Sequence, residues 1–533
     1  MKTISAINNE RGMVLIVALM FLTLLSVLGA AGIMTSTTDM KIACANRSAA
    51  KALHIAEAGL TRAEAELIND LDTDQDIGNT SFEATSGAID LTGLLSSTSF
   101  YTVFNAISFG SGSYTIEFKN YAPDPITAPT VYDPTTVWAR SIGTGPSLST
   151  ITLESYLSAE NLSPWNNAIF AGGGGGAVPI TGNVVIAGSV HILGEGLPAG
   201  TIVFSNQTGD CRNTNTGMDG TLAAAINGGT TSDLNAKFRV KNGRVDMSVG
   251  TADIGSSTSP LKGIYVTTGT DAGADGVNDD IIGGDNSGAG QNLYADKGAF
   301  SAQAYDLGDY NISMPTIDTA WMDANCLDLT AGGGVDEYVG PGGNQKGLIA
   351  GALELTWDYN VTGTNYFPNI DQNDVTTFED SHNAIRFNSV TNVLEIKGIV
   401  KVSTLNISDD ITYEGRGTIY TTGTGDIDGD VLPNANNSYP ITHVFGVVGT
   451  GDMTLGGSSQ ILLTGAYFCK GKVTTNMQTE LSGTIVCESF NISSQVPKIW
   501  QVPSLANNLP PGMPGAAAIW VFTDRTWREI TQE

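Results

Sequence analysis

The first apolar segment of the chain is long enough to cross a membrane. No side chain between Met13 and Thr38 is charged, and the stretch from Met13 to Gly32 is hydrophobic almost throughout. About 20 such residues span the hydrocarbon core of a bilayer as an α-helix. Because the short flank before the segment carries Lys2 and Arg11, we expect the amino terminus to stay in the cytoplasm and the rest of the chain to lie outside.

Beyond this segment the pattern changes from uniformly apolar to amphipathic without a break. Small and apolar residues recur at heptad spacing, so that a helix places them on one stripe: Ala49, Ala56 and Ala63 on one row and Leu53, Leu60 and Leu67 on the next. The polar positions expected on the outer side are Lys41, Arg47, Lys51, Glu57, Arg62, Glu64 and Glu66. The pattern predicts one rod from about Met13 to Ile68, about 80 Å long. A secretory signal cleaved near Ala31 has no use for such a continuation.

The start of the apolar run carries a more specific signal. A short polar leader ends in Arg11-Gly12, the uncharged run begins at once with Met13, and the amphipathic part contains Ala56-Glu57-Ala58-Gly59. In these features residues 8–70 resemble the class III leader and amino-terminal helix of type IV pilins, above all the PilX-like minor pilins. The resemblance implies cleavage after Gly12 by a prepilin peptidase and methylation of the new terminus at Met13.

The same resemblance assigns roles and locations. Processing falls to Arg11, Gly12 and Met13, and packing in the membrane and in the filament falls to Val14, Leu15, Ile16, Val17, Leu19, Phe21, Leu22, Leu24, Leu25, Gly29 and Gly32. The implied partners are other pilins, the pilus assembly machinery and the prepilin peptidase. The implied location is the inner membrane before assembly, and then the periplasm and an extracellular filament or the cell surface.

One position departs from the pattern of major pilins. These carry a glutamate at the fifth residue after the cleavage point, where this chain has Val17. In the family that carboxylate is thought to meet the amine of a neighbouring subunit inside the membrane, where an unpaired charge is expensive. Its absence favours a minor subunit that initiates the filament or lies near its tip. A K-type pseudopilin of type II secretion and a plain anchor with a helical stalk are the alternatives.

Short alternating runs follow the rod and predict a sheet. They are Phe100–Phe104, Tyr114–Phe118, Val137–Arg140 and Thr150–Tyr156, separated by Gly, Pro and Ser clusters. Such runs are typical of an antiparallel meander. Since a long helix needs a sheet to bury its outer half, we expect residues 71–165 to form a small sheet on the helix of residues 13–70, an α+β pilin-like module that follows a leader at 1–12.

A glycine run at 172–176 opens a region of different texture, which an internal repeat characterises. Leu463–Cys469 aligns with Leu481–Cys487 at a spacing of 18, Gly398 lies 19 before Gly417, and Gly446 lies 19 before Gly465. This period predicts a mainly-β body over residues 166–500, wound as a parallel β-solenoid, with residues 501–533 as its cap. The larger gap between Gly417 and Gly446 is interpreted as a loop insertion that holds Gly425–Asp430 and Pro433–Asn437. A twisted β-sandwich is the alternative.

Two acidic segments have residues suited to calcium. In LDTDQDIGNTSFE, the side chains of Asp72, Asp74, Asp76 and Glu83 and the main chain of Gly78 copy the ligand spacing of an EF-hand loop, although Ile77 stands where that loop needs glycine. Asp426, Asp428 and Asp430 form the second segment. No cofactor is required by this interpretation, calcium is the candidate ion, and solvated acidic loops are the alternative.

The cysteines are too scattered for zinc, because no C-x-x-C pair occurs among Cys44, Cys211, Cys326, Cys469 and Cys487. On a solenoid with an 18-residue period, Cys469 and Cys487 would lie one strand spacing apart, about 4.8 Å. That distance permits a disulfide. A ladder of buried free thiols is equally compatible with the sequence.

Charge and motifs narrow the function. With 25 basic against 54 acidic side chains, the formal net charge is −29, which argues against nucleic-acid binding. Solenoids host polysaccharide-cleaving enzymes, so a membrane-anchored enzyme acting on polysaccharides is the alternative function, with Asp409–Asp410 among the paired carboxylates. Neighbouring strand residues point to opposite faces, however. We therefore expect no enzyme, but a minor pilin that displays its β-body for adhesion to a host, a surface or a polysaccharide.

Overall fold

A computed structural model provides the structure of the 533-residue chain. The residues it describes are 10–74, 81–84, 87–90, 100–120, 136–173, 180–198, 201–205, 209–248, 251–267, 281–282, 293–296, 305–307, 312–330, 338–339, 345–349, 352–355, 382–388, 391–457, 459–476, 478–493 and 495–530. The chain divides into two compact units, Met1–Glu160 with Trp520–Glu533 and Asn161–Ile519.

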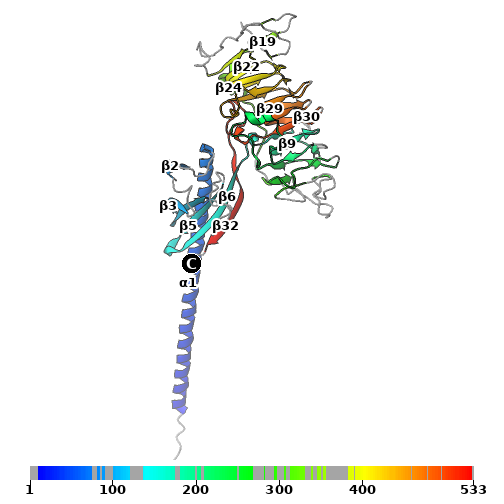
Figure 1. Ribbon diagram of the computed structural model, residues 1–533. Coiled ribbons are helices and arrows are strands. Elements are labelled where there is room, and N and C mark those ends of the chain that lie inside the picture. The colour runs from blue at the N-terminus through cyan, green and yellow to red at the C-terminus, as the bar shows by residue number, and fades with distance from the viewer. Residues whose placement is uncertain are drawn as a thin grey trace, which may run out of the picture. The chain divides into compact units, whose positions relative to one another are not determined.

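The first unit begins with one uninterrupted helix, α1, which runs from Glu10 to Asp74 (Figure 1). The apolar run and the amphipathic stripe thus belong to a single rod, as predicted, and the rod ends six residues beyond Ile68. Ala52 and Leu71 mark the limits of its fully buried positions, all of which lie in its second half.

That second half of α1 packs on a five-stranded sheet of order β3-β4-β5-β6-β32. The strands are β3 (Tyr101–Phe109), β4 (Gly112–Asn120), β5 (Thr136–Thr144), β6 (Thr150–Asn161) and β32 (Trp520–Ile530), and the first four form an antiparallel meander. A hairpin of β1 (Ser81–Ala84) and β2 (Gly87–Asp90) precedes them. All four expected runs lie in the meander, so the predicted antiparallel sheet is confirmed.

The helix approaches the sheet closely because both surfaces carry glycine and alanine. A Cβ atom at Gly143 on β5 would lie 2.3 Å from the backbone oxygen of Ala52 and 2.5 Å from the backbone nitrogen of Ala56. A Cβ at Gly59 on the helix would lie 2.1 Å from Ser141 Oγ. Larger residues then fill the flanks of the contact: Ile55, Leu67 and Leu71 from α1 and Phe104, Ile116, Phe118 and Leu157 from the sheet.

The buried stripe is wider than predicted, which corrects one expectation. Glu66, predicted on the outer side, is 3% exposed. It lies on the same heptad row as Ala52 and Gly59, which are also buried, so this row is a further part of the face that packs on the sheet. The buried carboxylate is paired, since Arg62 Nε donates to Glu66 Oε1 at 3.3 Å and the Arg62 guanidinium lies 4.5 Å from the centre of the Phe104 ring.

The last strand of the chain belongs to this sheet. Glu154 on β6 is 3% exposed and accepts hydrogen bonds from Arg140 Nε on β5 at 2.8 Å and from Arg528 Nη2 on β32 at 3.1 Å. One buried carboxylate therefore ties three neighbouring strands together. The prediction that residues 501–533 cap the body is wrong for Trp520–Ile530, which completes the sheet of the first unit instead.

The second unit is built of short strands that pair mostly in parallel. Its first half holds β7 (Ile169–Ala171), β8 (Ile180–Thr181), β9 (Val185–Ala187), β10 (Val190–Ile192), β11 (Ile202–Ser205), β12 (Cys211–Arg212), α2 (Gly220–Ala225), β13 (Lys237–Val240), β14 (Arg244–Asp246), β15 (Gly263–Val266) and β16 (Ile281–Ile282). Its second half holds α3 (Thr319–Asn325), β17 (Leu327–Asp328), β18 (Tyr338–Val339), β19 (Gln345–Ile349), β20 (Ala352–Leu355), β21 (Ala384–Asn388), β22 (Val393–Val402), β23 (Leu405–Ile407), β24 (Ile411–Thr421), β25 (Gly425–Ile427), β26 (Val431–Pro433), β27 (Val444–Gly449), β28 (Met453–Leu455), β29 (Leu462–Thr475), β30 (Glu480–Ile492) and β31 (Lys498–Trp500).

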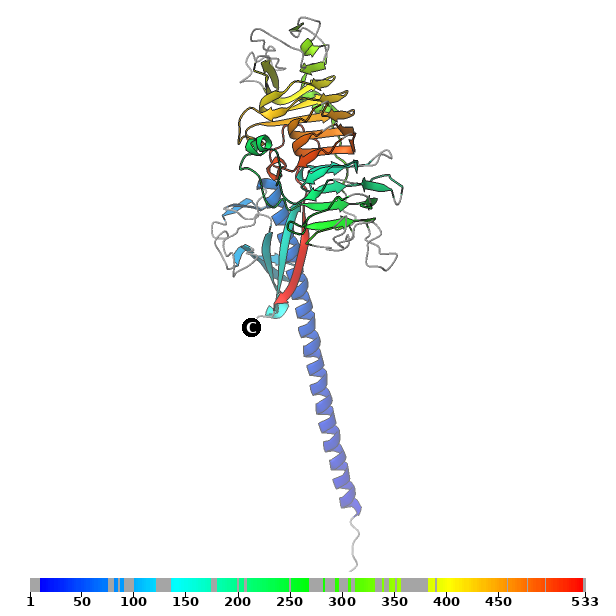
Figure 2. The same cartoon turned by 45° about the vertical axis from the view of Figure 1, so that its right-hand side comes forward.

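The rows of this body do not follow the chain from one end to the other. β7, β10, β13 and β15 stack in parallel in the first half, and β22, β24, β27, β29 and β30 in the second. The two series meet where β30 pairs with β7 and β31 pairs with β9, an order that can be followed in Figures 1 and 2. The last strands of the body thus pair with its first strands. The residues that follow them do not start from an open end of the stack, and so do not cap one.

The pairing tests the repeat directly. Leu463 pairs with Leu481, Cys469 with Cys487, and Gly398 with Gly417, as the spacings predict. Gly446 pairs with Ala466, so the alignment with Gly465 is wrong by one residue.

The interpretation of Gly425–Asp430 as part of a loop insertion is also wrong, because Gly425–Ile427 is strand β25 and pairs with both β23 and β28. Gly425 and Ile427 are buried and Asp426 is not, which is the alternation of a half-buried strand. The other expected part, Pro433–Asn437, does lead into the longer connection of this repeat, which runs from the end of β26 at Pro433 to the start of β27 at Val444.

Replacing Gly143 by Ala should loosen the contact between helix and sheet, because the added methyl group overlaps the backbone of α1. Overpacking of this kind costs about 1–3 kcal/mol. Hydrogen exchange of the full chain should become faster in peptides covering β4 and β5. Gly220→Ala, where no atom lies within 4 Å of the added Cβ, is the control and should leave exchange unchanged. Equal exchange in both variants would contradict the close approach.

Candidate functional site

The first half of α1 presents an apolar surface that no described residue covers. Its large side chains from Met13 to Leu28 are exposed by between 47% at Val17 and 68% at Leu15. At Gly29 and Gly32 a Cβ would meet nothing within 4 Å. Soluble proteins seldom leave so large an apolar surface bare, so this helix needs lipid or another apolar helix around it.

The predicted processing and packing residues all lie on this one element. Arg11 and Gly12 fall in the first turn of α1, and Met13, the first residue whose side chain is described, is 66% exposed. Within the described residues, one helix is long and apolar enough to cross a membrane, and its candidate span begins at Met13.

Several threonine hydroxyls of this half are bonded within the helix itself. Thr23 Oγ1 donates to the backbone oxygen of Met20 at 2.8 Å, and Thr35 and Thr38 donate to the backbone oxygens four residues back. Such bonds let polar side chains enter an apolar medium without losing a partner. These threonines therefore fit the apolar surface.

The comparisons with known proteins address this helix and the whole fold. Residues 11–61 match the family model described as PilX N-terminal. The crystal structure of the competence-associated pilin ComZ from Thermus thermophilus superposes with a TM-score of 0.52 at 18% identity, covering 91% of this chain and 98% of that one. Residues 11–61 therefore resemble a PilX amino-terminal segment, and the fold of the whole chain is similar to that of a pilin. No curated protein sequence matches it.

The family match covers the part of the PilX-like helix that the resemblance singled out. It begins at Arg11, beside the predicted cleavage point, and ends two residues beyond Gly59. The matched segment includes most of the exposed apolar half of α1, which is the part of the helix that an apolar surrounding can accept.

The EF-hand-like segment is only partly described. Asp72 and Asp74 belong to the last turn of α1, and Glu83 lies on β1. Asp76 and Gly78 lie outside the described residues. The first three positions of the expected loop are therefore helical, and calcium binding by this segment stays a prediction.

The second acidic segment does not gather its carboxylates. Asp426, Asp428 and Asp430 alternate along one extended stretch, so successive ones are separated by about 6.6 Å of backbone. Asp430 Oδ1 accepts the backbone N–H of Leu462 at 2.7 Å, which gives it a role in the turn. In the described part of the chain, no three His, Cys, Asp or Glu side chains converge as a metal site. Calcium at this segment also stays a prediction.

Cys469 and Cys487 are register neighbours on β29 and β30, and both are free thiols. The structure thus corrects the candidate disulfide, although the predicted stacking is right. Cys469 Sγ turns toward the backbone, donating to the oxygen of Gly451 at 2.9 Å. Burial raises the pKa of Cys469 to about 12 and that of Cys487 well above its ordinary value.

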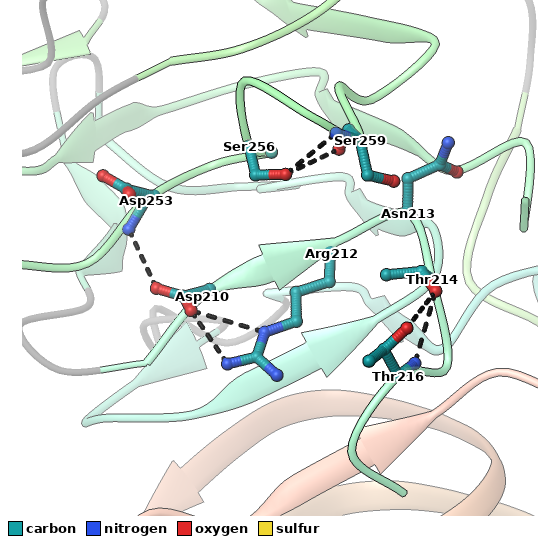
Figure 3. A pocket seen from close by; sticks show the side chains of 9 residues that line it. Asp210, Arg212, Asn213, Thr214, Thr216, Asp253, Ser256 and Ser259 are labelled. Carbon is teal, nitrogen blue, oxygen red and sulfur yellow. Dashed lines mark hydrogen bonds and ion pairs between the residues drawn. The ribbon is translucent and has the colours of Figure 1, made fainter. Parts of the chain in front are cut away.

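The body also contains clefts that no sequence motif indicated. One, of about 220 Å³, lies between the segments Asp210–Thr216 and Asp253–Ser259 (Figure 3). Its polar groups bind one another: Arg212 Nη2 donates to Asp210 Oδ2 at 2.9 Å, and Thr214 and Thr216 join their hydroxyls at 2.9 Å. A second cleft, of about 340 Å³, is lined by Asn215 of the same segment.

Alkylation should distinguish the exposed cysteine from the buried ones. Cys44 on α1 is exposed, and the other four cysteines are buried. At pH 8 a thiol of pKa about 12 is ionised to the order of 10⁻⁴, and only the thiolate reacts. Mass spectrometry of the folded chain after iodoacetamide treatment should show the label on Cys44 alone. A peptide pair joined through Cys469 and Cys487 would overturn the free-thiol state.

Asp428→Asn should stabilise the body at neutral pH. Burial, and after it the neighbouring Asp426 carboxylate, raises the pKa of Asp428, so ionising it works against folding. The unfavourable contribution of Asp428 to the unfolding free energy should therefore fade as pH falls from neutrality through the raised pKa, and the advantage of the variant over the wild type should disappear below the ordinary aspartate pKa. Denaturant titrations of both proteins at about pH 3 and pH 7 measure this difference.

Asp328 provides the control of opposite sign. Partial burial would raise its pKa, but the hydrogen bonds from Thr330 and Lys401 outweigh burial and lower it. Asp328→Asn should therefore destabilise the body at neutral pH, and the loss should shrink on acidification. If both variants shift stability in the same direction, the assignment of the two environments is wrong.

Proposed function

We propose that this chain is a minor subunit of a type IV pilus, cut after Gly12 by a prepilin peptidase and assembled through α1. The observation that carries the proposal is the bare apolar half of a helix whose other half is fixed on its own sheet. A helix that needed only to anchor the chain would end near Gly32, where the bilayer does. This one continues for another 42 residues to Asp74, as a packing rod that adjoining subunits can share.

The position of Val17 supports a minor rather than a bulk subunit. In this proposal a shaft subunit offers a carboxylate to the amine of its neighbour, and Val17 offers none. The size of the body also supports a minor subunit, because residues 161–519 are inserted between β6 and β32 of the small sheet. A filament with one such body on every subunit would be crowded, so few copies, including those that initiate assembly or lie near the tip, fit better.

We further propose that the parallel rows form a β-solenoid made of two stacks that join at β7 and β30. The in-register neighbours Leu463 and Leu481, and Gly398 and Gly417, support a repeating coil. Such a body is rigid and offers long side faces, which suits display on a filament for adhesion or other surface contacts. A net charge of −29 disfavours nucleic acid as the contacted ligand.

The mass of the amino-terminal peptide from filaments sheared off the producing cells tests the proposal. We expect a peptide that begins with N-methylated Met13. This result requires both processing and incorporation, since unassembled chains stay in the membrane. A peptide that begins at Met1 or near Ala31, or the absence of the chain from filaments, would overturn the assignment.

The Gly12→Val chain should keep its leader, because the peptidase needs a small residue at the cleavage point. The uncleaved chain should then be missing from sheared filaments. Gly29→Val is the matched control: it makes the same change on the same helix, at a position where nothing lies within 4 Å. Processing of Gly29→Val should match the wild type by immunoblot mobility. Cleavage of Gly12→Val at the wild-type rate would contradict the cleavage point.

A further inference from the structure

The second cleft of the body has the features of a binding site. Its volume is about 340 Å³, within the range of small-molecule sites. It is lined from three parts of the second unit: Asn215, Ile226–Gly229 with Thr231–Asn235, and Val502–Ser504.

Asn215, one of the lining residues, carries a buried amide oxygen. The residue is 5% exposed, and among the described residues its Oδ1 has no hydrogen-bond partner. The rest of the residue is fixed, since its Nδ2 donates to the backbone oxygen of Gln501 at 3.4 Å and its backbone N–H donates to that of Thr231 at 3.4 Å. An unsatisfied buried acceptor costs about 1–3 kcal/mol, so a ligand that donates a hydrogen bond here recovers that cost.

The remaining polar lining is mostly neutral. Asn227 and Asn235 contribute amides and Ser504 a hydroxyl. Asp233 accepts from Asn213 Nδ2 at 3.0 Å and pairs with Lys262 Nζ at 3.2 Å, and the same Nζ lies 3.2 Å from Asp296. Because one lysine is shared by two carboxylates, the charge that remains near the cleft is negative and disfavours an anionic ligand.

Apolar side chains complete the lining. Leu234, Val502 and Ile226 are buried, and Pro503 also lines the cleft. Amides that both donate and accept, together with apolar side chains, match a pyranose ring, which carries hydroxyls around its edge and C–H groups on its faces.

We propose that this cleft binds a neutral carbohydrate, with Asn215 Oδ1 accepting a hydrogen bond from a sugar hydroxyl. The neighbouring cleft of Figure 3 is the contrast, because its Arg212, Asp210 and Thr214 are already bonded to one another. The assignment rests on the proposed role of the body as a displayed surface, and it names the ligand class of that surface.

Isothermal titration calorimetry on the full chain in detergent, with maltohexaose, cellohexaose and chitohexaose as probes, tests the assignment. At least one probe should bind. Asn215→Leu keeps the size of the side chain and removes the oxygen, so it should weaken that binding by about tenfold. Asn235→Gly, which removes an amide at the cleft edge while keeping the positive φ of 51°, should weaken it by about threefold.

Asn392→Gly is the matched control for the edge variant. Asn392 also has a positive φ, 54°, and does not line the cleft, so this variant should bind as the wild type does. Absence of binding by all three sugars, or binding that Asn215→Leu and Asn235→Gly leave unchanged, would overturn the carbohydrate site. Because calorimetry does not require assembly, a chain that binds sugar but is missing from filaments would overturn the pilin role alone.

Discussion

The close contact between α1 and β5 is the constraint on which the first unit depends. Gly59 and Gly143 let the two backbones approach to a distance at which any side chain would collide, and Ala52 and Ala56 keep the helix surface equally thin. The second half of α1 is thereby held along the sheet. Since helix α1 is continuous through Gly32, holding one half also sets the axis of the other. The exposed apolar half is thus a rigid extension of a packed element, which is what a subunit needs if neighbours are to pack on it in register.

The way the chain enters and leaves the body follows from the same sheet. β6 and β32 are neighbours, so the body that separates them in sequence must begin and end close together. A parallel stack wound in sequence order would put its two ends at opposite ends of the stack, about 4.8 Å further apart for each row. Two stacks that meet at β7 and β30 avoid this separation. The pair of hydrogen bonds to Glu154 from Arg140 and Arg528 then closes the sheet across the returning strand.

The elements with strong local periodicity could be predicted from the sequence, and the closures between distant segments could not. The rod from Met13, the four strand runs of the meander and the stacking of Cys469 on Cys487 follow from spacing alone. The residue pattern of Trp520–Ile530 does not identify β6 as its partner, because a strand's own pattern carries no information about pairing with a segment more than 350 residues away. Glu66 shows another limit: its charge assigns it to solvent, although it lies on the heptad row of the buried Ala52 and Gly59 and is itself buried.

The candidate sites show the same difference between local patterns and contacts of distant segments. The apolar helix is a site made of consecutive residues, so its sequence suffices to find it. The cleft at Asn215 is assembled from segments near residues 215, 230 and 503, and each of them alone reads as an ordinary polar turn. Its defining feature, an acceptor with no donor, is a property of the packed surroundings. A stretch such as Asn213-Thr214-Asn215-Thr216 contains both cases: Asn213 is bonded through its amide and oxygen to Asp233 and to the backbone of Ala236, and two residues later the same side chain keeps one oxygen unbonded. Tertiary packing therefore decides which of these two asparagines keeps an unbonded oxygen, and the sequence around them does not.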